Sequence, residues 1–174
     1  MPTLSPQQNR EDKVFDRPLH LAGILDAAAD ELGRTWLGYD WNDRSRCNCG
    51  IVARQVMQTS APKLKKLLPP IYEDGTFYPT WSSMTDKYCS ETGLSKNEVF
   101  RGLFSAGLKY SDFAHLEELS HPEILERIIP HRTGKMPICR SNKSDVILYL
   151  RAWAWGIEEF HDQNSKLLSA TASR

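Results

Sequence analysis

The chain has 174 residues, including four cysteines, and its 22 basic and 22 acidic side chains give a formal net charge of zero. This length suits one domain with a buried core, and a neutral chain has no overall attraction to nucleic acid or to an anionic membrane. No apolar run approaches the roughly 20 residues of a membrane-spanning helix, and the N-terminal residues lack the apolar segment of a signal peptide. We therefore expect a soluble cytoplasmic protein with no membrane partner and with reduced cysteines.

The first half of the chain predicts two amphipathic helices and a shorter basic one. Residues 1–15 are rich in proline, glutamine and charge, which indicates a flexible segment. Asp16 is placed to cap a helix whose apolar residues recur every three or four positions until Gly33 ends it. A segment rich in tryptophan and tyrosine then leads to a second amphipathic helix, which ends near Gln58. A basic helix is expected at residues 63–68, before two prolines stop it.

The second half predicts one hairpin and several short helices. Asp74 and Gly75 form a turn signal that favours a small hairpin near residues 71–80. Helices are expected over residues 81–89 and after the capping boxes that start at Ser95 and Ser120. Ser144 is expected to cap the last long helix, from Asp145 to about His161. The chain as a whole predicts a mainly α fold, a compact single-domain array of about six to eight helices over residues 16–162, followed by a flexible tail at residues 163–174.

The strongest candidate site is Cys47-Asn48-Cys49-Gly50, where a polar loop becomes a helix. Asn48 is a good N-cap residue, which places Cys49 at the first helical position. The free N–H groups and the helix dipole at that position favour a thiolate and lower the pKa of a cysteine. The sequence therefore offers Cys49 as a reactive thiol, although free cysteines are also common as small buried packing residues.

A cysteine that opens a helix and is followed by glycine resembles the nucleophile of papain-like thiol hydrolases, a resemblance that covers residues 49–52. The resemblance implies that Cys49 is a catalytic nucleophile with a histidine partner. We take His131 as that partner, because it lies in a predicted loop and can be positioned. A gap of one residue between Cys47 and Cys49 is shorter than the spacing within zinc ligand pairs, so no metal site is predicted, and the cofactor remains open.

A second candidate site lies in residues 84–106, which resemble a DNA-binding helix-turn-helix. In this alignment Cys89 is the small residue of the first helix and Gly93 lies at the turn. The residues that would face the DNA groove are Lys96, Asn97 and Arg101. The neutral net charge and nearby glutamates weaken this interpretation, so nucleic acid is the less favoured partner.

A third candidate site is a basic, Gly- and Pro-containing stretch near His131. Its basic residues are Arg127, Arg132, Lys135, Arg140 and Lys143. Such a stretch can hold a phosphate, a carboxylate or an acidic partner.

These features support one main hypothesis and two alternatives. The main hypothesis is a small regulatory or interaction protein whose functional surface centres on the Cys47–Cys49 loop, with another protein or a small anionic ligand as its partner. The alternatives are a thiol-dependent enzyme with Cys49 as nucleophile, and a helix-turn-helix DNA-binding protein.

Overall fold

The computed structural model describes residues 17–34, 39–41, 43, 46–59, 72–73, 76–77, 88–89, 94–131 and 137–172. The helices of this part are α2 (Arg17–Arg34), α3 (Asn48–Met57), α5 (Lys96–Ser105), α6 (Tyr110–Glu118), α7 (Pro122–Ile128), the short 3-10 helix η2 (Ile129–His131) and α8 (Lys143–Ala172). The predicted mainly helical class is confirmed. None of the described helices is both long and apolar enough to cross a membrane.

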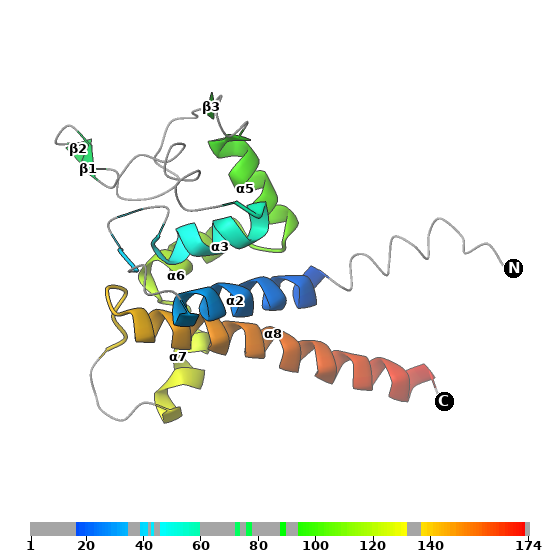
Figure 1. Ribbon diagram of the computed structural model, residues 1–174. Helices are drawn as coiled ribbons and strands as arrows, with labels where there is room; N and C mark the ends of the chain where they lie inside the picture. The colour runs from blue at the N-terminus through cyan, green and yellow to red at the C-terminus, as the bar shows by residue number, and fades with distance from the viewer. Residues whose placement is uncertain are drawn as a thin grey trace, which may run out of the picture.

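Helices α2 and α8 form the base of the molecule. They run side by side in opposite directions and share the most extensive contact between any two elements (Figure 1). The apolar residues of α2 that the sequence placed on one face are all buried, and these are Leu21, Ile24, Leu25, Ala28 and Leu32. They pack against α8, whose buried residues include Val146, Tyr149, Leu150 and Trp153. One apolar stripe on each helix therefore builds this half of the core.

The remaining helices lie on the two sides of this pair. Helix α3 packs against α2, and α5 and α6 pack against α3, whereas α7 packs against α8. Figure 1 shows α3 above α2 and α7 below α8. Gly107 follows the end of α5, with a φ of 113° that favours glycine and with the N–H of Leu108 bonded to the carbonyl of Leu103 at 3.2 Å.

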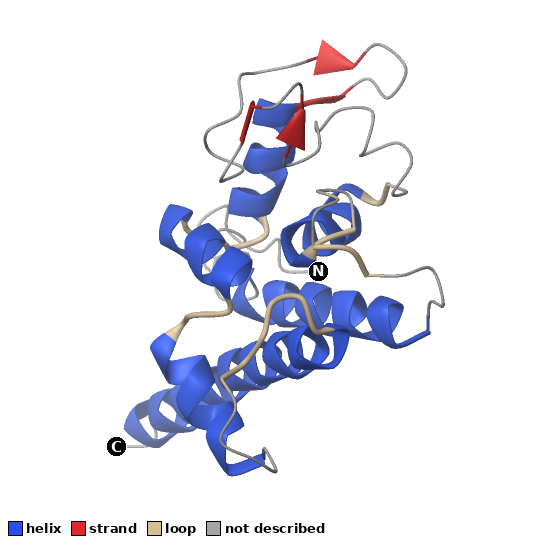
Figure 2. Ribbon diagram, turned by 90° about the vertical axis from the view of Figure 1, so that its left-hand side faces the viewer, coloured by secondary structure: helices blue, strands red, loops and turns tan. Residues whose placement is uncertain are grey.

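Two short antiparallel hairpins complete the described fold. One pairs β1 (Tyr72–Glu73) with β2 (Thr76–Phe77), where the sequence predicted a hairpin, and the other pairs β3 (Tyr88–Cys89) with β4 (Leu94–Ser95). Figure 2 shows the strands gathered at the end of the molecule where α5 begins. The expected helix at 63–68 lies outside the described residues.

The predicted helix at 81–89 is wrong at its C-terminal end. Cys89 lies in a strand opposite Leu94, and Tyr88 lies opposite Ser95. Tyrosine favours a pleated, half-buried surface, and the intervening Thr92-Gly93 supplies a turn.

Both ends of α8 differ from the prediction. Asn142, not Ser144, caps its start, because the Asn142 Oδ1 accepts hydrogen bonds from the backbone N–H groups of Ser144 at 2.9 Å and Asp145 at 3.4 Å. The sequence predicted an end near His161, but the helix continues to Ala172. Residues 162–172 contain no glycine or proline and include lysine, leucine and alanine, which are good helix formers.

Candidate functional site

The first turn of α3 is built differently from the sequence prediction. Cys47 is the N-cap, with extended backbone angles, and its Sγ accepts a hydrogen bond from the N–H of Gly50 at 3.4 Å. Asn48 is therefore the first helical residue and Cys49 the second. The predicted cap was one residue late, because the side-chain amide of Asn48 is engaged with another helix.

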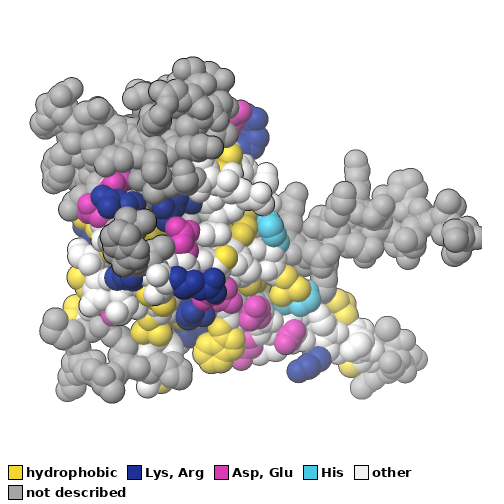
Figure 3. Space-filling model, viewed as in Figure 1, with side chains coloured by type: hydrophobic (Ala, Val, Ile, Leu, Met, Phe, Trp, Pro, Cys, Tyr) yellow, Lys and Arg dark blue, Asp and Glu magenta, His cyan; other side chains and the backbone are white. Residues whose placement is uncertain are grey.

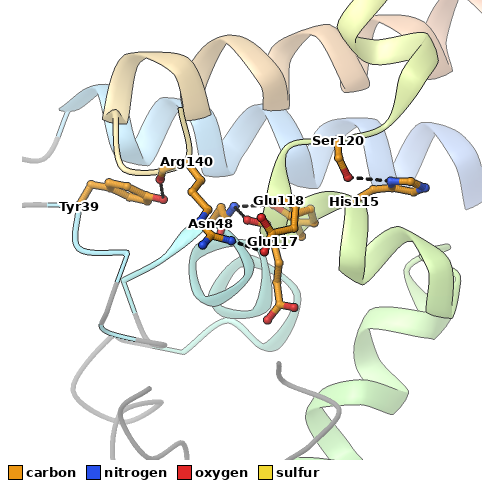
Figure 4. Close-up of polar contacts among 8 residues, drawn as sticks. Tyr39, Asn48, His115, Glu117, Glu118, Ser120 and Arg140 are labelled. Atoms are coloured by element: carbon orange, nitrogen blue, oxygen red, sulfur yellow. Dashed lines mark hydrogen bonds and ion pairs between the residues drawn. The ribbon is translucent and has the colours of Figure 1, made fainter. Parts of the chain in front are cut away.

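Asn48 joins the start of α3 to the end of α6 (Figure 4). Its side chain is buried, with 1 % of the residue exposed. The Nδ2 group donates to the backbone carbonyl of Leu116 and, at 3.2 Å, to that of Glu117, while Oδ1 accepts from the N–H of Cys49 at 3.1 Å. The last carbonyls of a helix have no partner within that helix. Asn48 therefore caps the C-terminus of α6 from a position 68 residues earlier in the chain.

Both cysteines of the candidate site are buried. Cys49 is 1 % exposed and Cys47 is 5 % exposed, and both belong to the apolar core. A nucleophile must reach its substrate, so this burial agrees with the alternative that the two cysteines are packing residues. Cys139 is the exposed thiol among the cysteines whose side chains the structure describes.

The structure does not bring His131 to Cys49. His131 ends η2, which follows α7 beneath α8, whereas Cys49 lies in α3 above α2 (Figure 1). The α2–α8 pair lies between these two positions. The side chain of His131 is outside the described part of the structure, but its backbone position already separates the two residues predicted to act together.

An aromatic and basic surface lies beside the Cys47–Cys49 segment. The hydroxyl of Tyr39 donates a hydrogen bond to the carbonyl of Arg140, and burial raises the pKa of that hydroxyl well above its ordinary value. The guanidinium of Arg140 lies 4.0 Å from the centroid of the Trp41 ring and forms an ion pair with Glu118. We call these four residues, together with Arg46, the Trp41–Arg140 patch.

Asp43 stabilises the loop that carries Trp41. This carboxylate is nearly buried and pairs with the Nε of Arg46 at 2.9 Å. The carbonyl of Asp43 accepts the N–H groups of Arg46 and Cys47, both at 2.8 Å. A second carboxylate, Asp40, lies 3.5 Å from the guanidinium of Arg46. These contacts fix the turn immediately before α3.

The predicted basic stretch does not form a single anion site within the described residues. Arg127 pairs with Glu159 at 2.5 Å and lies over the ring of Trp155, whereas Arg140 pairs with Glu118. The helical rise places the α8 residues that contact Arg127 about 20 Å from the start of α8, near which Arg140 lies. Lys143 begins α8, and Arg132 and Lys135 lie outside the described residues.

Charges of both signs alternate on the face shown in Figure 3. Arg151 of α8, for example, contacts Asp30 at 2.6 Å and Asp26 at 4.0 Å on α2. A continuous basic field, which binding to a phosphate backbone requires, is absent from this face of the described structure.

The helix-turn-helix interpretation placed Cys89 in its first helix, but Cys89 lies in β3. Residues 84–87 lie outside the described part of the chain. Asn97 and Arg101 are exposed on α5, as that interpretation required, while the side chain of Lys96 lies outside the described part. The neighbouring Glu98 is only partly exposed. Exposure of two polar residues on a helix is ordinary for a surface helix, so it does not restore the motif.

A polar junction that the sequence analysis missed connects α6, α7 and α8. The buried hydroxyl of Tyr149 donates to the carbonyl of His115 at 3.1 Å and accepts from the N–H of His121 at 3.0 Å. The imidazole rings of these histidines are 5.0 Å apart, and the Nδ1 of His115 lies 3.0 Å from the Oγ of Ser120. Burial raises the pKa of Tyr149 well above its ordinary value. No periodicity in the sequence marks a tyrosine that bonds two backbones far away along the chain.

Two histidines do not complete a metal site. Among the described residues, no group of three or more histidine, cysteine, aspartate or glutamate side chains is arranged to hold a metal ion. The junction therefore positions the turn between α6 and α7 through hydrogen bonds.

No protein-family model, curated protein or solved structure is significantly similar to this chain.

Proposed function

We propose that the protein is a small helical interaction protein that binds another protein through the Trp41–Arg140 patch, the surface beside the Cys47–Cys49 segment. The observation that carries this proposal is the stacking of the Arg140 guanidinium 4.0 Å from the Trp41 ring centroid. Tryptophan, tyrosine and arginine are the residue types most enriched among the energetically important residues of protein interfaces. This patch contains all three at partly exposed positions.

The contacts beneath the patch support the proposal, because they hold its side chains in place before a partner arrives. Tyr39 fixes the backbone of Arg140, and Glu118 fixes its guanidinium. Asn48 ties α3 to the end of the helix that carries Glu118. A prearranged surface loses less conformational freedom on binding, which favours affinity. In this proposal the two buried cysteines shape the surface by packing, not by chemistry.

The mixed charge of the patch favours a protein partner over a small anion. Arg140 and Arg46 are each paired with carboxylates. An anion would have to displace those carboxylates, whereas a protein surface can add complementary contacts of both signs around them. We include a cytoplasmic location in the proposal, because Cys47, Cys49 and Cys139 form no disulfide bond in the described structure, as is usual in a reducing compartment.

The test is site-specific photo-cross-linking in the native host. A benzophenone amino acid at Ser141, an exposed position next to Arg140, should capture one predominant partner, and the same group at Ser111, an exposed position on α6, should not. Arg140→Glu should abolish the adduct, because it reverses the charge beside Glu118. Arg101→Glu introduces the same change on an exposed face of α5 and should leave the adduct intact. No adduct specific to position 141, or an adduct that survives Arg140→Glu, would overturn the proposal.

A further inference from the structure

The C-terminal half of α8 carries large apolar side chains that face away from the described body. Phe160 is 66 % exposed, Leu167 is 65 % exposed and Leu168 is 60 % exposed. Isolated exposed apolar residues are ordinary, but three of them within nine positions of one helix form a patch.

Phe160 and Leu167 continue the same helical stripe that builds the core, and Leu168 lies next to that stripe. The stripe repeats at steps of three and four residues through Leu150, Trp153, Ile157, Phe160, Asn164, Leu167 and Thr171. Such spacing is the seam along which two helices pack in a coiled coil. In the first half of α8 the seam is buried against the body, as the burial of Leu150 and Trp153 shows.

The C-terminal half of α8 is exposed because α8 is longer than α2, the helix against which its first half packs. Helix α2 has 18 residues and α8 has 30 residues. At a rise of about 1.5 Å per residue, α8 is therefore about 18 Å longer than α2. Figure 1 shows the C-terminal end of α8 continuing past the first residues of α2. We call residues 157–172 the overhang, although its first residues still contact the body through Ile157, which packs against the core, and through Glu159, which pairs with Arg127 of α7.

We propose that the overhang packs antiparallel against the overhang of a second copy of this chain, with a two-fold axis near Asn164. The seam of one helix then faces the same seam of its partner, which makes the contact self-complementary. This proposal is independent of the Trp41–Arg140 patch, which lies near the opposite end of α8.

The distribution of charge along the overhang favours a second copy of this chain as the binding partner and an antiparallel orientation of its helix. Glu158 and Asp162 are exposed in the first half, and Lys166 is exposed in the second half. An antiparallel pair places Lys166 beside the acidic half of the other copy. A parallel pair instead places each acidic residue beside the same acidic residue of the other copy, which is repulsive. Antiparallel helix dipoles also attract. A net charge of zero removes overall repulsion between two chains.

The size of the overhang sets the expected strength of the dimer. The paired segments are about 24 Å long, which corresponds to an interface at the small end of those that are stable. A polar residue such as Asn164 on the seam lowers stability but specifies the alignment of the helices. We therefore expect a reversible dimer that forms with increasing protein concentration.

Sedimentation equilibrium of the purified chain tests this association. The wild-type protein should change from monomer to dimer between about 1 and 500 µM, the range expected of a micromolar complex. Leu167→Glu should shift the midpoint at least about tenfold upward, because it places a charge on the seam. Ser169→Glu adds the same charge on the opposite side of α8 and should leave the midpoint unchanged. A single monomer mass at every concentration, or equal effects of the two variants, would overturn the proposal.

Cysteine cross-linking tests the direction of the helices. In a background with Cys89 and Cys139 replaced by serine, Asn164→Cys should form a disulfide-linked dimer under mild oxidation, because the two copies of position 164 meet near the axis. Thr171→Cys should not, because the two copies of position 171 then lie about 20 Å apart. Efficient linkage at both positions indicates a parallel pair and contradicts the antiparallel arrangement. Neither experiment involves another protein, so its outcome is separate from that of the photo-cross-linking.

Discussion

At the level of single residues, Asn48 joins two helices through three hydrogen bonds of one side chain. One buried amide group caps the carbonyl end of α6 and accepts the N–H of Cys49. An amide can donate and accept at once, whereas a carboxylate can only accept. The position therefore requires asparagine for a chemical reason that α3 alone does not reveal.

Substitution of Asn48 should separate these two roles. Asn48→Ala should lower the free energy of unfolding by about 1–3 kcal/mol, because it leaves buried carbonyls of α6 without a donor. Asn48→Asp should cost more, because it also places a carboxylate against those carbonyls. Guanidinium denaturation would measure both effects, with Gln163→Ala at an exposed position of α8 as the control. A smaller loss for Asn48→Asp than for Asn48→Ala would contradict the donor role.

The burial of the cysteines predicts their order of reaction. Iodoacetamide should modify exposed Cys139 in the native protein, whereas Cys47 and Cys49 should react only when the chain unfolds. Peptide mass spectrometry at increasing denaturant concentration would resolve each site. Rapid modification of Cys49 in the native protein near neutral pH would show that its thiol is accessible, and the thiol-enzyme hypothesis would then become the better one.

At the level of elements, the ends of helices are decided by competition between neighbouring polar residues. At the start of α8, Asn142 and Ser144 are both good caps, and the turn in which the N–H of Asn142 bonds to the carbonyl of Cys139 at 2.9 Å selects Asn142. Asp145, which is nearly buried, also accepts the N–H of Cys139 at 2.8 Å. These contacts make the loop before α8 part of its cap.

The two candidate caps of α8 can be compared directly. Asn142→Ala should lower the free energy of unfolding by about 0.5–2 kcal/mol, because the first N–H groups of the helix lose their acceptor. Ser144→Ala should change it by less than about 0.5 kcal/mol, as is usual at an exposed position. Thermal and chemical denaturation of the two variants would check the difference, and equal losses would show that Ser144 shares the cap.

The sequence predicted most helices but not their first residues. Apolar spacing identified α2, α3 and the first half of α8, because a stripe at helical period must be buried somewhere. It placed the caps of α3 and α7 one residue from their positions at Cys47 and His121. In α7, Pro122 occupies the first turn, which leaves His121 outside the helix.

The candidate site was harder to predict than the fold. Helix-start placement correctly identified Cys47–Cys49 as the beginning of α3. It could not reveal that both thiols are buried, because their neighbours come from distant parts of the chain. The pairing of Arg140 with Trp41 likewise joins residues about 100 positions apart, and no local pattern marks such a contact.

At the level of the whole molecule, two tyrosines connect the layers and make stability sensitive to alkali. Tyr39 joins the loop before α3 to the loop before α8, and Tyr149 joins α8 to the turn between α6 and α7. Burial raises the pKa of both hydroxyls above their ordinary values. Above a pH of about 10, unfolded tyrosines lose protons that these native tyrosines keep, so the free energy of unfolding decreases as the pH rises.

Replacing Tyr149 should weaken the dependence of the free energy of unfolding on alkaline pH. Tyr149→Phe should be less stable than the wild type by about 1–3 kcal/mol at neutral pH, because two backbone groups lose their partner. Its stability should then fall less steeply above about pH 10, because one shifted hydroxyl is gone. Denaturation midpoints from pH 7 upward would measure this slope. Tyr110→Phe, at a 66 % exposed position, should leave it unchanged. A slope for Tyr149→Phe equal to that of the wild type would contradict the prediction.

The pairing of α2 with α8 has a consequence for synthesis of the protein. The stripe of α2 emerges from the ribosome early, but the helix that covers it is translated roughly 7–30 s later at ordinary elongation rates. During that interval the nascent chain exposes Leu25, Ala28 and Leu32 without their final neighbour. Co-translational chaperones bind such surfaces, and premature termination before residue 143 would leave a product unable to bury them. The chain should therefore depend on completed translation for its folding, and truncated products should be degraded or aggregate.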